Sequence, residues 1–258
     1  MGTFRLGLLG NPVAHSRSPE IQHAMLELAG LEGSYTKIQA DEETFARTVA
    51  EMRAGEWDGF NVTMPHKALA ASSCDEVSEA ARISWSVNTL FVRENRLFGE
   101  STDTTAMVSL LEQDRFDHSS PILLLGAGGG AAAVLAGIGG RDAYVAARRA
   151  DAARELADRF GAEVVSWGTT VAGAIVVNST PVGMGGEGLP EGVLAASAGL
   201  IDLAYGQVDT PAVSQARQFG LPVVDGYEFL VRQAIDSFAI WTGTRVAFER
   251  LMERLRKL

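Results

Sequence analysis

The chain has 258 residues, of which 47% are hydrophobic and 21% are charged, a composition typical of a globular protein with one large or two modest domains. Its formal net charge of −10, without long blocks of like charge, disfavours nucleic acid as a partner and favours small molecules. The single cysteine, Cys74, excludes an intrachain disulfide framework and is typical of a reducing compartment.

The first residues, "MGTFRLGLLGNP", lack the basic region, long apolar stretch and cleavage site of a signal peptide, so we expect a cytoplasmic protein. Residues 119 to 140 carry no charge and are long enough to span a bilayer. Their glycines cluster after a short leucine run, which favours a buried strand, a turn and an alanine-rich helix instead. We expect no membrane partner and no bound metal, and either a monomer or a homodimer.

The first hundred residues alternate between strand and helix patterns. "FRLGLLG" (4 to 10) is typical of a buried parallel strand, and Ser18-Pro19 opens a helix that ends before Gly30. The sequence then predicts a strand over 34 to 40, a helix over 42 to 54 and a strand over 58 to 63. Lys67 stands at the end of the strand-like run "NVTMPHK" (61 to 67), which overlaps this last strand. This order is that of an α/β unit.

A second α/β series follows a helix predicted over 104 to 111 and a charged linker, "EQDRFDHSSP". Its strands are predicted over 122 to 126, 142 to 147, 174 to 178, 199 to 203 and 221 to 224. The tail from Phe229 is helical, with a break at "WTGT", and we expect it to fold back onto the first domain.

The turn in "ILLLGAGGGAAAVLAG" places Gly126, Gly128 and Ala131 at the three small-residue positions of a dinucleotide-binding pattern. An apolar strand precedes it and a helix follows, so backbone amides there can hold a pyrophosphate. The next strand ends in Arg148-Arg149 and not in an acid, which favours a 2′-phosphate and hence NADP over NAD. The alternative for the glycine turn is a tight strand-to-helix turn that binds no ligand. The alternative for the two arginines is that they are solvated charges at the start of a surface helix.

Polar side chains gather in several loops of the first half: Ser16 and Ser18, Asn61, Thr63 and Lys67, Asn88, and Thr102 with Asp103. If these loops converge, they form a pocket for a polyhydroxylated small molecule, with Lys67 and Asp103 as its acid/base candidates. Taken alone, Ser18 before Pro19 is more typical of a helix N-cap than of a binding residue. We interpret His15 and His66 as structural or solvent-facing.

These motifs together resemble the shikimate dehydrogenase family. The resemblance runs in order through "GNPVAHSRSP", "NVTMPHK", "SVNT", "STD", the glycine turn, "NSTPVGM", "DLAY" and "DGYEFLVRQAIDSFAIWTG". It implies a cytoplasmic enzyme of the chorismate pathway that reduces 3-dehydroshikimate to shikimate with NADPH. It also implies two α/β domains: a substrate-binding and catalytic domain over 1–103, completed by about 233–258, and a Rossmann-type NADP-binding domain over 104–232.

The resemblance implies roles for residues at matching positions. Lys67 and Asp103 would be the catalytic pair, and the lysine would meet the carbonyl oxygen that becomes an alkoxide. The substrate would be held by Ser16, Ser18, Asn61, Thr63, Asn88, Thr102, Tyr205 and Gln233. The cofactor would be held by Gly126, Ala127, Gly128, Gly129, Arg148, Arg149, Thr180 and Gly226.

Several positions depart from the family pattern: Trp85-Ser86 before "VNT", Ser101, Ala147, Arg149, Gly206-Gln207 and Phe229. They leave open a paralogue that acts on quinate or an amino-substituted analogue of shikimate. A nucleotide-binding sensor without chemistry is a further alternative, which the presence of both Lys67 and Asp103 disfavours.

Overall fold

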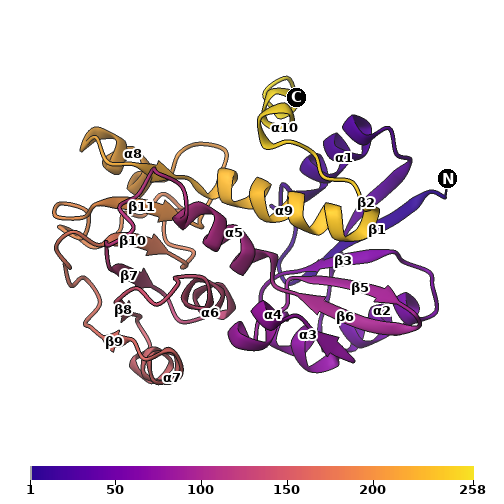
Figure 1. Ribbon diagram of the computed structural model, residues 1–258, viewed down its shortest axis with the longest axis horizontal. Coiled ribbons are helices and arrows are strands. Elements are labelled where there is room, and N and C mark those ends of the chain that lie inside the picture. The colour runs from indigo at the N-terminus through magenta and orange to yellow at the C-terminus, as the bar shows by residue number, and fades with distance from the viewer. Residues whose placement is uncertain (1) are drawn as a thin grey trace. The chain divides into compact units, whose positions relative to one another are not determined.

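The computed structural model describes residues 2–258, and the chain divides into two compact units. Unit 1 consists of Met1–Thr105 and Val231–Leu258, and unit 2 of Ala106–Leu230. Each unit has its own sheet flanked by helices (Figure 1). The expectation of two α/β domains, with C-terminal helices that rejoin the first, is therefore confirmed.

Within the described residues, unit 1 has a six-stranded sheet in the order β2-β1-β3-β5-β6-β4. Its strands are β1 (Phe4–Gly10), β2 (Gly33–Gln39), β3 (Gly59–Val62), β4 (Glu76–Val77), β5 (Thr89–Arg93) and β6 (Arg96–Glu100). β1 pairs in parallel with β2 and β3, whereas β5 pairs antiparallel with β3 and β6. The turn between β5 and β6 is Glu94-Asn95, with both residues at positive φ, as a two-residue hairpin of matching twist requires.

Helices cover both faces of this sheet. They are α1 (Ser18–Ala29), α2 (Glu42–Arg53), α3 (Lys67–Ser73), α4 (Glu79–Ser84) and α10 (Phe248–Leu255), with parts of α5 (Thr102–Leu111) and α9 (Gly226–Thr242). Phe45 and Met52 of α2 pack on Phe60, in a core that also takes up alanines of α3 and α4. On the opposite face, Leu6 and Tyr35 pack against Trp241 of α9.

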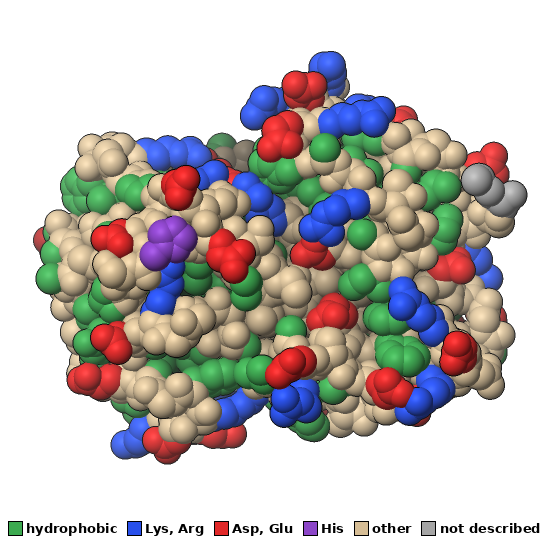
Figure 2. All heavy atoms as spheres, in the orientation of Figure 1, with side chains coloured by type: hydrophobic (Ala, Val, Ile, Leu, Met, Phe, Trp, Pro, Cys, Tyr) green, Lys and Arg blue, Asp and Glu red, His purple; other side chains and the backbone are tan. Residues whose placement is uncertain are grey.

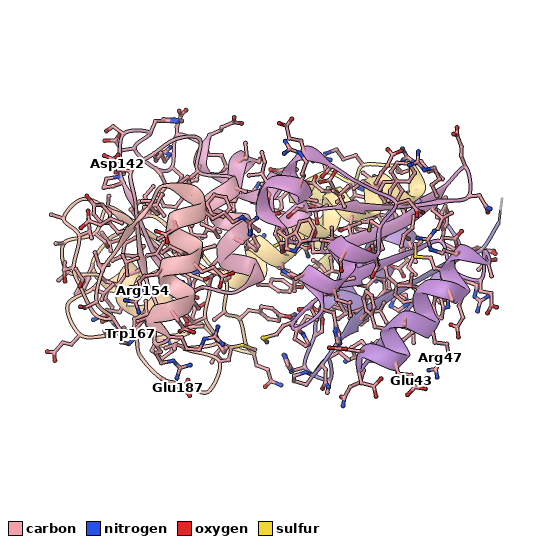
Figure 3. The ribbon with its side chains drawn as sticks, turned by 90° about the horizontal axis from the view of Figure 1, so that it is seen from below. Glu43, Arg47, Asp142, Arg154, Trp167 and Glu187 are labelled. Carbon is pink, nitrogen blue, oxygen red and sulfur yellow. The ribbon has the colours of Figure 1, made fainter. Side chains whose placement is uncertain are left out.

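The helix α2 shows how the sequence forms these elements. The Asp41 carboxylate accepts a hydrogen bond from the Thr44 amide at 2.8 Å and so caps the helix N-terminus. Phe45 and Val49 then fall on the buried face. The opposite side is exposed, and Figure 3 shows Glu43 and Arg47 extending from it at the surface.

The first helix begins one residue away from the expected N-cap. Arg17 occupies the cap position of α1, and Ser18 is its first helical residue. Ser18 therefore does not cap the helix; instead, the Ser16 hydroxyl accepts a hydrogen bond from the Ser18 amide at 3.2 Å. The predicted C-terminal glycine is confirmed, because Gly30 adopts the left-handed conformation with φ 65°.

Unit 2 contains a fully parallel sheet in the order β12-β11-β10-β7-β8-β9. Its strands are β7 (Ile122–Leu125), β8 (Ala143–Ala146), β9 (Glu163–Val164), β10 (Ile175–Asn178), β11 (Gly199–Asp202) and β12 (Val223–Val224). Its further helices are α6 (Gly129–Ala136), α7 (Ala150–Phe160) and α8 (Pro211–Gln218). In chain order this is the doubly wound arrangement, which reverses direction between β7 and β10.

Alternate residues of β7 belong to two separate cores, as expected for a strand covered on both faces. Leu124 packs with residues of α5, α6 and α7, whereas Leu123 and Leu125 pack with Val213 of α8. The uncharged segment 119–140 thus forms a buried strand, a turn and a helix, as predicted. No helix within residues 2–258 is long and apolar enough to cross a membrane. On the face seen in Figure 2, acidic and basic side chains are interspersed.

Candidate active site

Lys67 begins a helix and does not end a strand. β3 stops at Val62, and a loop of residues 63 to 66 separates it from α3, which starts at Lys67. The expected strand-end position is therefore wrong; the proline at 65 cannot donate a main-chain hydrogen bond and favours this break. His66 anchors the loop, because its buried ring makes a 2.6 Å hydrogen bond between Nε2 and the Ala40 carbonyl.

The lysine and the aspartate named from the sequence form an ion pair. Lys67 Nζ lies 2.5 Å from Asp103 Oδ2, and the two side chains are 18% and 10% exposed. Asp103 lies in the first turn of α5, where the helix dipole favours a negative charge. Because the pair is largely withdrawn from water, loss of either partner would leave a poorly compensated charge.

A buried network of amides and hydroxyls adjoins Asp103 in the chain. Asn88 Nδ2 donates to Thr102 Oγ1 at 2.9 Å and to Gln233 Oε1 at 3.3 Å, and Asn88 Oδ1 accepts from the Thr102 amide at 2.7 Å. Thr102 is fully buried, whereas Asn88 and Gln233 are 3% and 6% exposed. The network thus brings together a residue just before β5 with residues of α5 and α9, which lie far apart in the sequence.

Asn61 belongs to the same network, and protein groups engage both ends of its amide. Its Oδ1 accepts from the Tyr35 hydroxyl at 2.8 Å. Its Nδ2 lies within donating distance of the Asn88 carbonyl and of the hydroxyls of Thr89 and Ser237, at 3.1, 3.2 and 2.9 Å. The Nδ2 group of Asn61 thus has more protein acceptors than protons, whereas Oδ1 keeps a second lone pair with which it could accept a hydrogen bond.

The remaining predicted substrate residues occupy other positions. Ser16 and Ser18 form a pair at the start of α1, with their hydroxyl oxygens 3.1 Å apart. Thr63 is half-buried just after β3. Tyr205, also half-buried, follows β11 and belongs to unit 2, whereas the other seven belong to unit 1.

Three network residues were missed in the sequence: Tyr35, Thr89 and Ser237. Thr89 stands beside Asn88 in "SVNT", and Ser237 lies one helical turn after Gln233, so adjacency to named residues was the available signal. Tyr35 gave no such signal, because it is one residue of an ordinary strand pattern.

In unit 2, the glycine turn between β7 and α6 has the conformation that a phosphate cradle needs. Gly126 has φ 119°, and an added Cβ would lie 2.4 Å from Ser179 Oγ. Gly128 caps α6, and an added Cβ there would meet no atom within 4 Å. Ala127 is half-buried, and Gly129 is exposed at the start of the helix. The turn therefore leaves open space in front of the helix N-terminus, where main-chain N–H groups are free to bind an anion. These features fit a dinucleotide pyrophosphate.

The end of β8 fits a further phosphate. Arg148 and Arg149 follow this strand after one further residue, Ala147, and are exposed. Neither guanidinium has a hydrogen bond or ion pair to any residue in the described part of the chain. Two unpaired guanidinium groups at this strand end suit a 2′-phosphate, because Arg grips phosphate with paired donors.

The loop after β10 is held by a buried aspartate that the sequence analysis did not single out. Asp202 is fully buried and accepts from Asn178 Nδ2 at 2.8 Å, and burial raises the pKa of its carboxyl group. Asn178 Oδ1 in turn accepts from the Thr180 hydroxyl at 2.6 Å. These hydrogen bonds fix Thr180 relative to the ends of β10 and β11.

Gly226, named as a cofactor residue, is required for packing. A Cβ at Gly226 would lie 2.3 Å from the Ala204 carbonyl oxygen, so only glycine lets α9 start against the "DLAY" segment. Within residues 2–258, no group of three or more His, Cys, Asp or Glu side chains is placed to hold a metal ion.

Comparisons with known proteins agree on one family. Residues 8–90 match the model of the shikimate dehydrogenase substrate binding domain. A shikimate dehydrogenase (NADP(+)) of Anaeromyxobacter sp. is 39% identical, over 97% of this chain and 94% of its own length. One from Exiguobacterium sp. is 34% identical, over 94% of both chains. The crystal structure of shikimate 5-dehydrogenase (AroE) from Thermus thermophilus, in complex with NADP(H) and shikimate, has a TM-score of 0.88 and 32% identity, covering 99% of each chain.

Proposed function

Because the chain belongs to the shikimate dehydrogenase family, we propose that unit 1 binds the substrate through its polar network and unit 2 binds the cofactor. The enzyme is an NADP-dependent oxidoreductase that catalyses the reversible reduction of 3-dehydroshikimate to shikimate. The observation that carries its chemistry is the Lys67–Asp103 ion pair. No relative reported above supports the alternatives, a quinate or aminoshikimate enzyme or a non-catalytic sensor.

Lys67 acts on the oxygen atom that changes charge. NADPH, when bound, supplies the hydride that reduces the carbonyl carbon. As the carbonyl oxygen gains negative charge, the Lys67 ammonium stabilises it and donates or relays a proton to it. In the oxidation of shikimate, the lysine accepts that proton from the hydroxyl group.

Asp103 orients the lysine and holds the reacting hydroxyl. Its carboxylate already fixes the ammonium at 2.5 Å, which reduces the conformational freedom that the lysine would lose on reaction. The position of Asp103 next to Thr102 in α5 links this pair to the buried amide network. A substrate hydroxyl in reach of the pair thus meets both an acceptor and a donor.

The polar network provides recognition of the ring hydroxyls. Asn88 and Gln233 present amides, and Ser16, Ser18 and Thr63 present hydroxyls, each able to donate or accept. A ligand that lacks a matching hydroxyl leaves one of these groups unpaired, at about 1–3 kcal/mol. Thr102 and Asn61 support Asn88 through buried hydrogen bonds, and Tyr205, the remaining residue that the resemblance names, belongs to unit 2.

The cofactor is held by the glycine turn and by the two arginines. The backbone of residues 126 to 129 takes the pyrophosphate at the start of α6, and Arg148 and Arg149 take the 2′-phosphate. Thr180 and the Gly226 region complete the site. We place the enzyme in the cytoplasm, as a monomer or homodimer without nucleic-acid or membrane partners, on the acidic net charge and the single cysteine.

A substrate panel tests this function. Purified enzyme is given shikimate, quinate or an amino-substituted shikimate with NADP+ or NAD+, and formation of the reduced cofactor is followed by absorbance. We expect kcat/KM to be highest for shikimate with NADP+. If quinate or the amino analogue exceeds shikimate by tenfold or more, the substrate assignment fails; if no substrate is oxidised, the enzymatic function fails.

A further inference from the structure

Three fully buried hydroxyl groups meet beneath the amide network. Thr89 Oγ1 and Ser237 Oγ are 2.8 Å apart, Thr102 Oγ1 and Ser237 Oγ are 3.1 Å apart, and Thr89 Oγ1 and Thr102 Oγ1 are 3.3 Å apart. All three residues have 0% exposure. They come from β5, α5 and α9, so this triangle joins three elements that carry predicted substrate residues.

The Ser237 hydroxyl can donate one hydrogen bond and accept two, and its neighbours determine which bonds these are. Its own proton has an acceptor one helical turn back, the Gln233 carbonyl at 3.1 Å, a common bond for serine in a helix. Its oxygen has two lone pairs, and the two shortest contacts to it come from Thr89 at 2.8 Å and Asn61 Nδ2 at 2.9 Å. These two donors fill its accepting capacity.

Thr102 must then direct its proton elsewhere. The other acceptors near its hydroxyl are Asn88 Oδ1 at 3.2 Å, Thr89 Oγ1 at 3.3 Å and Gln233 Oε1 at 3.4 Å. Asn88 Oδ1 is the nearest of the three, and Thr89 Oγ1 already lies within accepting distance of Asn61 Nδ2, at 3.2 Å. Its oxygen meanwhile accepts from Asn88 Nδ2 at 2.9 Å. Which hydroxyl of the triangle donates and which accepts therefore determines how the amides of Asn88 and Gln233 are oriented. In the proposed function, these amides present polar groups to the substrate.

We propose that Ser237 is a positioning residue for substrate binding: it orders the triangle that holds Asn61, Asn88 and Gln233 in their working orientation. This inference rests on the proposed function, because it takes the amides of Asn88 and Gln233 to be substrate contacts that Asn61 supports. Ser237 acts through them and does not touch the reacting atoms. Within residues 2–258, no hydrogen bond joins Ser237 to Lys67 or Asp103.

Removal of the Ser237 hydroxyl would leave two buried donors, from Asn61 and Thr89, without their best acceptor. The amides would reorient to recover a partner, and the substrate would meet a less ordered surface. Because the Lys67–Asp103 pair is untouched, the effect should fall on the KM for shikimate and not on kcat.

The test compares Ser237→Ala with Thr48→Ala. Thr48 is 2% exposed, lies in α2 of the same unit, and donates to the carbonyl one turn back at 2.9 Å, without joining the network. We expect Ser237→Ala to raise the KM for shikimate about tenfold, as loss of one buried hydrogen bond implies, with kcat within about threefold. The KM for NADP+ should not change, and Thr48→Ala should alter neither constant.

A second pair decides the matter if Ser237→Ala does not fold. Thr89→Val keeps the side-chain volume but removes the hydroxyl, whereas Thr89→Ser keeps the hydroxyl. We expect Thr89→Val to raise the KM for shikimate several-fold more than Thr89→Ser does. The affinity for shikimate, measured by calorimetry without cofactor, should decrease to the same degree.

The outcomes separate the inference from the function. If the parent enzyme does not oxidise shikimate, the proposed function and this inference fail together. If it does, and Ser237→Ala has the KM of Thr48→Ala even when its melting temperature falls, the triangle is only structural and the inference alone is refuted. Equal KM values for Thr89→Val and Thr89→Ser would refute it in the same way.

Discussion

At the scale of single residues, the ion pair with Asp103 holds the Lys67 ammonium, the proposed catalytic group, in one position. The chain separates the two residues by 36 positions, yet their polar atoms lie 2.5 Å apart. α3 and α5 each begin at or next to the residue concerned, so both side chains are fixed by helix starts. Rigid elements position such groups more closely than mobile loops do.

Replacement of Lys67 by Ala should lower kcat by a factor on the order of 10² or more, with a smaller change in substrate binding, because the ammonium interacts most strongly with the developing alkoxide. Asp103→Asn should show the same class of defect. Steady-state kinetics with shikimate and NADP+ provide the measurement, and Lys257→Ala, near the exposed C-terminus, is the control.

The double variant of Lys67 and Asp103 adds a sharper comparison. If the two residues act as a unit, the double variant should be little slower than either single variant, since groups that work together are not additive. Near-normal turnover of Lys67→Ala with only a raised KM would show that the lysine binds substrate and does not assist the chemistry.

The sequence revealed the polar residues that stand in motifs but not the contacts that arrange them. Lys67, Asp103, Asn88 and Gln233 could be named because each lies in a recognisable segment. The bond from Asn61 to Ser237 joins positions 176 residues apart, and no local pattern encodes such a contact. The supporting triangle therefore became visible only in the folded chain.

At the scale of elements, strongly periodic segments were predicted and short polar ones were not. The strand over 4–10 and the helix after Ser18 agree with β1 and α1. The β5–β6 hairpin was missed because its turn, Glu94-Asn95, lacks the glycine that usually marks positive φ. β9 and β12 have only two residues each, too few to show alternation, and β9 was not predicted.

An ion pair connects α2 to β6, one strand of the missed hairpin. Arg53, the last residue of α2, donates through Nη1 to Asp75 Oδ2 at 2.6 Å and through Nη2 to the Ser73 carbonyl at 3.2 Å. The Asp75 carboxylate also accepts from the Leu97 amide of β6 at 2.7 Å. The hydrogen bond from Arg53 is the main reason why the pKa of Asp75 is lowered to about 2.

A lowered pKa makes the stability of the fold depend on acid. Because Asp75 has a lower pKa in the folded chain than its ordinary value of 3.8, its contribution is present above pH 3.8 and is lost as the pH falls toward 2. In the Asp75→Asn variant, the free energy of unfolding should therefore decrease less than in the parent protein as the pH falls from 3.8 to about 2. Denaturant unfolding at successive pH values measures this difference.

Glu43→Gln is the matched control for this measurement, because Glu43 is an exposed acid on the outer side of α2 (Figure 3). At acid pH, its free energy of unfolding should decrease in the same way as that of the parent protein. If the Asp75→Asn curve ran parallel to the parent curve from about pH 4 to about pH 2, the Arg53–Asp75 contact would not contribute to acid sensitivity.

At the scale of the whole molecule, the proposed function assigns the two ligands to two differently built units. Unit 1 has a mixed sheet and a buried network of amides and hydroxyls, whereas unit 2 has a fully parallel, doubly wound sheet with a glycine turn. Hydroxyl groups match the first environment, and phosphates match the second. Damage to one ligand's site should therefore leave binding of the other ligand intact.

The arginines after β8 provide the test of this division. Replacing Arg148 and Arg149 by Ala should weaken NADPH binding by roughly 1.5–3 kcal/mol for each charged hydrogen bond lost, while NADH, which lacks the 2′-phosphate, binds as before. Shikimate binding measured without cofactor should not change, because its proposed contacts lie mainly in unit 1. Arg154→Ala, an exposed arginine of α7 in the same unit (Figure 3), should leave the affinities for both ligands unaltered. Equal efficiency of the parent enzyme with NADH and NADPH would contradict the role of the arginines, and a parallel loss of shikimate affinity would contradict the division between the units.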